Sequence, residues 1–206
     1  MSGRLYGVGV GPGDPELLTL KAARIVENAG VVAHFAKAGR PSNARGIIAH
    51  RLRPDVVELP LLYPVTVEIE KDNAGYKTAI AAFFDASAAA VAAHLDAGRD
   101  VAVLSEGDPF FYGSYLHLHA RLAQRYPTEV IPGVTSMSGC WSAAGRPLVR
   151  GDEILSILPA TLPEAELTRR LGQCDGAVLM KLGRNLAKAR RALAAAGKAD
   201  RAIYVE

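Results

Sequence analysis

Residues 4–35 carry the pattern of a strand, a helix and a second strand, and this pattern limits the fold of the chain more than any other feature. Residues 4–10 are an apolar run typical of a buried strand. Residues 15–28 place leucine, alanine and valine at helical spacing before Gly30 closes the segment. Residues 31–35 are again apolar and strand-like. Because such a crossover joins parallel strands, the segment predicts an α/β fold built on a parallel sheet.

The turn inside this unit, GVGPGDP at residues 9–15, is rich in glycine but does not meet the requirements of a phosphate-binding loop. The dinucleotide fingerprint needs a third glycine where Asp14 stands, and the turn lacks the Gly-Lys-Ser/Thr ending of the P-loop. The carboxylates of Asp14 and Glu16 would also repel a phosphate. A cationic or zwitterionic ligand suits these charges better, and a turn that binds no ligand is the alternative.

Further strand-to-loop passages follow along the chain. A Val-rich strand at residues 100–104 leads into SEGDPFFYGS at 105–114, and a strand at 129–131 leads into PGVTSMSGCWSAAG at 132–145. A later strand, at residues 176–181, ends in LMKLG. Open α/β sheets bind ligands at the carboxyl ends of their strands, so these loops are candidate binding sites.

The remaining segments complete a prediction of two α/β domains. The expected helices are 43–50, 76–96, 115–124, 163–171 and 186–196, the expected strands are 55–59, 154–158 and 202–206, and a proline-containing connection is expected at 61–67. The polar break RYPTE at residues 125–129 marks the expected boundary. It separates an N-terminal α/β domain, residues 1–125, from a C-terminal α/β domain, residues 126–206.

Composition excludes several classes of function. The 24 basic and 21 acidic residues leave a net charge of +3, and the basic residues are scattered, so nucleic-acid binding is not expected. Cys140 and Cys174 lie far apart without a histidine at ligand spacing, so neither a metal site nor a disulfide is expected. No apolar run approaches the length of a membrane span, and the first residues lack the pattern of a leader. We therefore expect a cytoplasmic protein that does not bind membranes.

Taken together and in this order, the loops GVGPGDP, SEGDPFFYG, IPGVTSMSG and VLMKLG resemble those of the tetrapyrrole methylases, over essentially the whole chain. The resemblance implies two α/β domains, S-adenosylmethionine in the cleft between them, a tetrapyrrole substrate and a homodimer. The stretches GVGPGDPELLTLKA, EVIPGVTSMSGCWSAAGRPL and GDEILSILPATLPE resemble members that methylate C20 of precorrin-2, giving precorrin-3A in cobalamin biosynthesis. Relatives continue past the position of Glu206, so C-terminal strands are expected to be missing.

Two alternatives stay open at this point. One is methylation of cobalt-factor II, the cobalt-containing analogue of the oxygen-independent route. The sequence does not discriminate between the two routes, because cobalt would arrive inside the substrate. The other alternative is a non-catalytic protein that holds a tetrapyrrole or S-adenosylhomocysteine without turnover.

The resemblance also assigns contacts with the cofactor to residues in each of the four loops. They are Pro12 in the first loop, Glu106, Gly107, Asp108 and Phe111 in the second, Thr135 and Ser136 in the third, and Met180 in the fourth. The plainer alternatives are turn formation by the proline and the aspartate, helix capping by the threonine and serine, and core packing by the methionine.

The reaction implied by the resemblance is an in-line methyl transfer without a covalent protein intermediate, in which the enzyme holds an electron-rich carbon against the methyl group. The residue that removes the C20 proton is not assigned. Side chains available by residue type are Glu106, Asp108, Tyr63 and Tyr112. Arg146 and Arg150 are candidate contacts for the carboxylates of the substrate.

Overall fold

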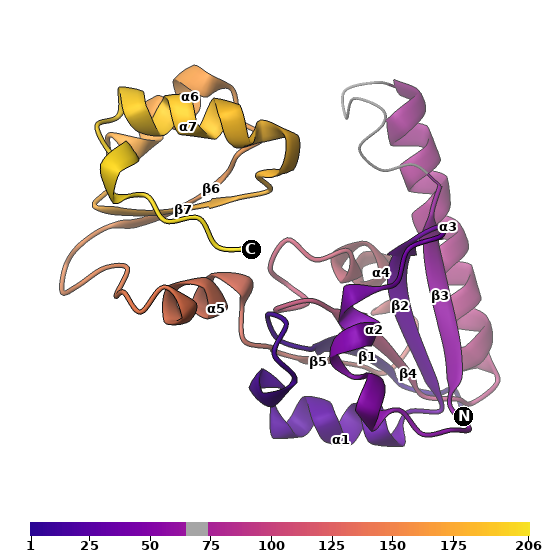
Figure 1. Cartoon of the computed structure of the whole chain (residues 1–206). Coiled ribbons are helices and arrows are strands. Elements are labelled where there is room, and N and C mark those ends of the chain that lie inside the picture. Colours follow the sequence, from indigo (N-terminus) through magenta and orange to yellow (C-terminus); the bar gives the residue numbers. More distant parts are fainter. Residues whose placement is uncertain (65–73) are drawn as a thin grey trace. The chain divides into compact units, whose positions relative to one another are not determined.

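The computed structural model describes residues 1–64 and 74–206, which form two compact units (Figure 1). The units are Met1–Ser136 and Met137–Glu206. The boundary expected after residue 125 falls ahead of the strand Thr128–Ile131, which pairs with the first strand of the chain. That strand therefore belongs to the first unit, and the assignment of the units as separate domains stays a prediction.

The first unit contains a parallel sheet of five strands in the order β3-β2-β4-β1-β5. Its strands are β1 (Leu5–Gly9), β2 (Val31–Lys37), β3 (Val57–Tyr63), β4 (Val101–Ser105) and β5 (Thr128–Ile131). Leu5 of β1 lies opposite Val101 of β4 on one side and Thr128 of β5 on the other. The predicted α/β fold is confirmed, and the carboxyl ends of β4, β1 and β5 lie side by side.

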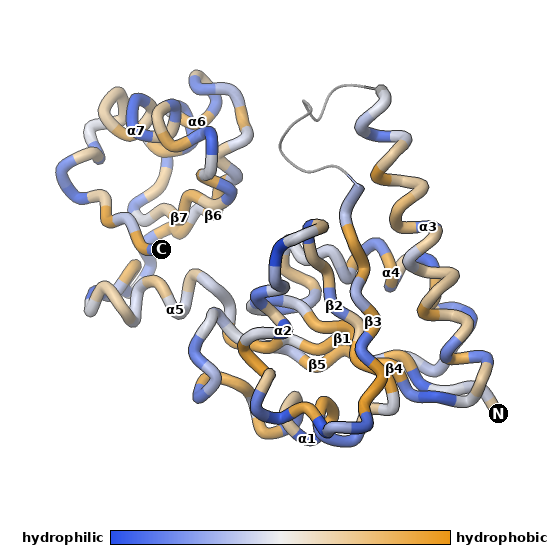
Figure 2. Tube along the Cα trace, turned by 45° about the vertical axis from the view of Figure 1, so that its right-hand side comes forward, coloured by the Kyte–Doolittle hydropathy of each residue, from blue (hydrophilic) through white to orange (hydrophobic). Residues whose placement is uncertain are grey.

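Helices cover both faces of this sheet (Figure 1). They are α1 (Leu20–Asn28), α2 (Asn43–Ile47), α3 (Ala74–Asp96) and α4 (Tyr115–Leu122), with short 3-10 turns at Pro15–Leu17 and Ala49–Arg51. Val101 and Val103 of β4 pack with α3 and α4, while Ala102 and Leu104 pack with α1 and α2. Figure 2 shows the strands mostly in hydrophobic colours. A strand buried on both faces is apolar at every position, as the Val-rich run predicts.

The helical pattern at residues 15–28 is interrupted in the structure. Thr19 is extended, with φ −68° and ψ 147°, and its hydroxyl accepts a hydrogen bond from the Ala22 amide at 3.2 Å. This is the geometry of a helix N-cap, so α1 begins at Leu20 and the preceding turn stays separate. The predicted single helix is therefore wrong at its start.

Strand β3 runs further than its sequence suggests. Pro60 lies inside the strand, opposite His34 of β2, although a proline-containing connection was expected from residue 61. The strand is the first in the sheet order and pairs with β2 on one side. A proline is tolerated on such an edge, because its missing N–H need not pair there. Residues 65–67 of the expected connection lie outside the described residues.

The second unit pairs β6 (Leu155–Pro159) with β7 (Gly176–Met180) in parallel. Its helices are α6 (Glu164–Leu171) and α7 (Leu186–Ala195), with 3-10 turns at Gly183–Asn185 and Ala199–Arg201, and α5 (Ser136–Ala143) begins at the last residue of the first unit. Leu158, Leu167 and Leu171 form its core with Ala192. The strand predicted at 202–206 is wrong: these residues have no strand partner and are largely exposed. An extended segment needs a neighbouring strand to satisfy its backbone groups.

Helix α3 corrects one expectation about length. Residues Gly75–Asp96 are long and apolar enough to cross a membrane by length and composition, so the statement that no apolar run approaches that length is wrong. The helix is nevertheless part of the first unit's core, because Val91, Ala92 and Leu95 pack against the sheet. Several of its exposed residues are alanines, which raise the mean hydropathy although their side chains are small. The length and hydropathy of α3 are therefore only weak evidence for a membrane segment.

The buried His34 gives the fold a sensitivity to acid. Burial lowers the pKa of His34, while Glu58, with Oε2 3.8 Å from Nε2, raises it and Arg45 lowers it. Because the pKa is lowered, the unfolded chain takes up the proton first as the pH falls. The contribution of His34 to stability is therefore fully present above the histidine pKa of the unfolded chain, about 6.5, and is lost as the pH falls below that value. We expect His34→Gln to flatten the loss of unfolding free energy between pH 7 and pH 5, measured by urea unfolding.

The same replacement at the exposed His50 is the matched control for this experiment. His94 and His117 also have pKa values lowered mainly by burial, so the His34 variant should retain part of the slope. An acid slope that is identical in His34→Gln and in the unmodified protein would contradict the prediction.

Candidate functional site

Three loops follow the carboxyl ends of adjacent strands in the first unit. The first loop, residues 10–19, follows β1; the second, residues 106–114, follows β4; and the third, residues 132–135, follows β5. Because β1 lies between β4 and β5, the first loop emerges between the other two. This arrangement brings together stretches that are far apart in the sequence, at the edge where α/β sheets bind ligands.

Backbone hydrogen bonds join the first and second loops. The Val10 amide donates to the carbonyl oxygen of Ser105 at 2.9 Å, and the Gly107 amide donates to that of Gly11 at 2.8 Å. Gly11 and Gly107 form an antiparallel bridge, and both have positive φ, 82° and 64°. These left-handed conformations favour glycine, so the bridge explains glycine at both positions.

The three loops meet through the backbones of Gly9, Gly107 and Gly133, which we call the glycine junction. A Cβ on Gly133 would lie 2.1 Å from the carbonyl oxygen of Gly107 and 2.9 Å from Cα of Gly9. A Cβ on Gly9 would lie 2.6 Å from the same oxygen and 2.6 Å from the Gly133 nitrogen. The atoms in the way are backbone atoms, which cannot rotate aside as a side chain can. The junction therefore excludes any side chain at Gly9 or Gly133.

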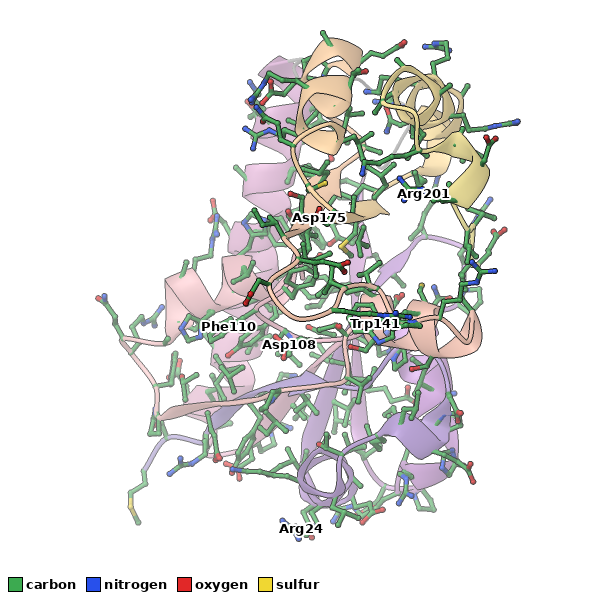
Figure 3. All side chains as sticks on the ribbon, turned by 90° about the vertical axis from the view of Figure 1, so that its left-hand side faces the viewer. Arg24, Asp108, Phe110, Trp141, Asp175 and Arg201 are labelled. Atoms are coloured by element: carbon green, nitrogen blue, oxygen red, sulfur yellow. The ribbon has the colours of Figure 1, made fainter. Side chains whose placement is uncertain are left out.

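Asp108, which Figure 3 labels, adds a side-chain connection to the glycine junction. Its Oδ1 accepts a hydrogen bond from the Phe110 amide at 2.9 Å, within the second loop. Its Oδ2 accepts one from the Gly133 amide at 3.1 Å, across to the third loop. Both oxygens of the carboxylate are thus engaged by backbone donors.

The second loop also holds a strained residue. Tyr112 has φ 55°, in the left-handed region that bulky side chains rarely adopt, and its ring packs edge-on against Phe111. Of the described residues other than glycine, Lys181 shares this property, with φ 60°, and it follows β7 in the fourth loop. Strained backbone of this kind clusters at functional sites. Both residues lie in loops that the sequence singled out for binding.

The far end of the second loop is fixed to strand β3. The hydroxyls of Tyr63 and Ser114 are hydrogen-bonded, and Ser114 directly precedes α4. Burial raises the pKa of Tyr63, and the bond to Ser114 lowers it by a smaller amount. A phenol with a raised pKa stays protonated at neutral pH, so Tyr63 suits the role of hydrogen-bond donor better than that of base.

The structure places seven of the eight predicted cofactor contacts in these three loops or at the first residue of α5, which follows the third loop. They are Pro12, Glu106, Gly107, Asp108, Phe111, Thr135 and Ser136. Gly107 packs closely on the third loop, since a Cβ there would lie 3.3 Å from the Ser136 nitrogen. Met180 belongs to the second unit, as do Arg146 and Arg150. The contacts of these residues with a cofactor or substrate stay predictions.

Sequence reasoning missed two features of the site. It treated the glycines as turn formers and did not identify Gly9 and Gly133 as packing partners across strands. It also passed over Ser105, whose hydroxyl is buried at the end of β4 without a hydrogen-bond partner among the described residues. The polar residue that ends the otherwise apolar run VAVLS was the available sign.

Two other features do not belong to this site. A surface cavity of about 300 Å³ lies between α3 and α4, lined by Asp85, Ala88, Ala89, Arg121, Leu122 and Arg125. These residues lie on α3, on α4 or in the turn that follows α4, and none of them is in the loops at the strand ends. Within residues 1–64 and 74–206, no group of three His, Cys, Asp or Glu side chains is placed to hold a metal ion.

The chain that carries this parallel sheet and the loops at its carboxyl edge has clear relatives among known proteins. Residues 4–206 match the family described as Tetrapyrrole (Corrin/Porphyrin) Methylases. The chain belongs to this family of methyltransferases, which use S-adenosylmethionine.

Among individual proteins, the chain is 66% identical over 204 residues to the precorrin-2 C(20)-methyltransferase of Sinorhizobium sp, covering 99% of this chain and 83% of that protein. It is 31% identical over 209 residues to the cobalt-precorrin-2 C(20)-methyltransferase of Salmonella typhimurium, covering 100% and 84%. Among solved structures, it resembles the uroporphyrin-III C-methyltransferase of Thermus thermophilus complexed with S-adenosylhomocysteine. That likeness has a TM-score of 0.63 and 26% identity, and it covers 94% of this chain and 72% of the other.

Proposed function

We propose that this chain transfers a methyl group from S-adenosylmethionine to C20 of precorrin-2, giving precorrin-3A in cobalamin biosynthesis. The observation that carries the proposal is the 66% identity to a precorrin-2 C(20)-methyltransferase over nearly the whole chain. The glycine junction supports it, because it places the loops with seven of the predicted cofactor contacts at one edge of the sheet.

The residues of the three loops fit a cofactor of this kind. Gly13 has φ 142°, and none of the described residues lies within 4 Å of where a Cβ would lie, so the backbone beside Pro12 is open to a ligand. The unpartnered hydroxyl of Ser105 is a polar group at the same edge. The carboxylates of Asp14 and Glu16 are exposed within the first loop and suit a positively charged sulfonium. In this proposal Pro12, Gly107, Thr135 and Ser136 would line the cofactor site, and the contact assigned to Met180 stays a prediction.

When bound, S-adenosylmethionine supplies an electrophilic methyl group that an electron-rich ring carbon attacks in line. The protein's part is to bind and orient, and rigid loops serve this purpose because a near-attack geometry contributes much of the rate. The connections among the three loops hold Thr135 and Ser136 at a fixed place relative to Gly107. The residue that removes the C20 proton stays unassigned. Of the candidates, Asp108 has both oxygens engaged and Tyr63 favours its protonated form.

A second candidate substrate is the cobalt-containing analogue. The 31% identity to the cobalt-precorrin-2 C(20)-methyltransferase of Salmonella typhimurium favours it, although the higher identity to the Sinorhizobium protein favours the metal-free substrate.

We further propose that the enzyme is a homodimer of the cytoplasm. Sedimentation equilibrium tests the dimer, and a monomer over the working concentration range would reject it.

The test of the main proposal uses the protein as given. We expect isothermal titration to detect binding of S-adenosylhomocysteine, and we expect one labelled methyl group per tetrapyrrole when precorrin-2 and labelled S-adenosylmethionine are added, as read by mass spectrometry. Excess S-adenosylhomocysteine should suppress the transfer. Faster methylation of the cobalt-containing substrate would favour the second candidate function. Binding of S-adenosylhomocysteine without methyl transfer would support a non-catalytic binding protein. Folded protein that binds neither cofactor nor substrate would reject both methyltransferase functions and the binding function.

A further inference from the structure

We infer that Asp108 is a positioning residue, whose carboxylate holds the third loop against the second instead of binding the cofactor. This inference rests on the proposed function, because the loop that Asp108 holds carries Thr135 and Ser136, two of the predicted cofactor contacts. It replaces the ligand contact that family resemblance assigns to this side chain.

The geometry of the carboxylate carries the inference. One oxygen accepts from the Phe110 amide at 2.9 Å and the other accepts from the Gly133 amide at 3.1 Å. Hydrogen bonds to an ionised acceptor are stronger than neutral ones, so these bonds compete well with a ligand. The bond to Gly133 joins residues 25 positions apart in the sequence.

The chain contains an internal comparison for this role, because Gly-Asp-Pro occurs twice, at residues 13–15 and 107–109. Asp14 accepts a hydrogen bond from the Glu16 amide at 2.8 Å, just as Asp108 accepts one from the Phe110 amide. Both are turns in which an aspartate bonds the backbone two residues on. Of these two aspartates, Asp108 also accepts a hydrogen bond from another loop. The turn at Asp108 therefore differs from the turn at Asp14 by the additional hydrogen bond from Gly133.

The place of Gly133 explains why this bond matters. Its amide lies at the glycine junction, where Gly9 and the carbonyl oxygen of Gly107 approach so closely that no side chain fits. Thr135 and Ser136 are two and three positions further along the chain, and Ser136 packs on Gly107. Releasing Gly133 from Asp108 would free the third loop to move away from Gly107. A cofactor that contacts both loops would then meet a surface that is no longer preorganised.

The test compares Asp108→Ala and Asp108→Asn with the matched variant Asp14→Ala. In protein without ligand, we expect Asp108→Ala to raise the hydrogen-exchange rate of the Gly133 amide at least tenfold, as measured by NMR on labelled protein, while Asp14→Ala leaves that rate unchanged. We expect Asp108→Ala to weaken the binding of S-adenosylhomocysteine about tenfold in titration calorimetry. Asp108→Asn keeps an acceptor oxygen for Gly133. It should therefore show a smaller rise in the exchange rate and a smaller loss of affinity than Asp108→Ala.

The alternative role predicts a different result. If the carboxylate binds the cofactor directly through its charge, Asp108→Asn will lose as much affinity as Asp108→Ala, and the Gly133 amide will exchange at the same rate in all variants without ligand. That outcome would overturn the inference. If the alanine variant does not fold, the asparagine variant decides between the two roles by the same exchange measurement. Unmodified protein that binds no S-adenosylhomocysteine would refute the proposed function, whereas the exchange rates would still show whether Asp108 holds Gly133.

Discussion

Replacing Tyr115 with alanine is expected to lower the free energy of unfolding by about 3–5 kcal/mol, the usual cost of deleting a buried aromatic ring. Tyr115 is fully buried at the start of α4, and its ring lies directly against Gly7 of β1. Its hydroxyl is 3.2 Å from Nδ1 of His119. Removal of the ring would leave a cavity under the central strands, and urea unfolding monitored by circular dichroism measures the loss.

The contact with Gly7 provides a stringent check on this explanation. A Cβ on Gly7 would lie 2.3 Å from Cζ of Tyr115, so Gly7→Ala should cost about 2–3 kcal/mol in the unmodified protein. In the Tyr115→Ala background the same substitution should cost much less, because the ring is gone. Tyr115→Phe is the control: it keeps the ring and loses the hydroxyl's contact with His119, for about 0.5–1.5 kcal/mol. Additive losses in the double variant would contradict direct packing of the ring on Gly7.

Replacing Gly133 with alanine is expected to cost about 3 kcal/mol of unfolding free energy and to weaken the binding of S-adenosylhomocysteine. The added methyl would lie 2.1 Å from the carbonyl oxygen of Gly107, so the second and third loops must separate to accept it. Urea unfolding and titration calorimetry on the same preparation measure the two effects.

Gly46→Ala is the matched control for this substitution. Gly46 lies inside α2, has nothing within 4 Å of where a Cβ would lie and is not among the positive-φ glycines. Alanine there should stabilise the protein by up to about 1 kcal/mol, since it favours a helix over glycine. A Gly133→Ala protein as stable as the Gly46→Ala protein would show that the glycine junction is not tightly packed.

Local patterns of the sequence were enough to predict the architecture of the first unit. The βαβ pattern at residues 4–35 corresponds to β1, α1 and β2, and the Val-rich run at 100–104 corresponds to β4. These predictions hold because a strand buried on both faces is apolar throughout, whatever its neighbours are. Prediction failed where a segment's structure depends on which strands lie beside it. Strand β3 includes Pro60 because it lies at an edge of the sheet. Residues 202–206 form no strand, because none of the described strands pairs with them.

For the candidate site, too, features set by the local sequence were predicted and features set by neighbouring strands were not. The loops were predicted from glycine-rich turns and from family resemblance, and seven of the predicted contacts lie together in the first unit. The connections between loops were not predictable, because they depend on the strand order that places β1 between β4 and β5. Nothing in the sequence near Asp108 indicates that its partner is Gly133, since only the assembled sheet brings the two within 3.1 Å.

The glycine junction has a consequence for how such a protein can diversify. Its close contacts are made by backbone atoms, so the exposed side chains that project from the loops carry none of that packing. Leu17 and Phe110 are exposed on these loops and can be exchanged in combination while the scaffold beneath them is inherited unchanged. A combinatorial library at these two positions therefore varies the surface of the loops without disturbing the backbone contacts beneath it.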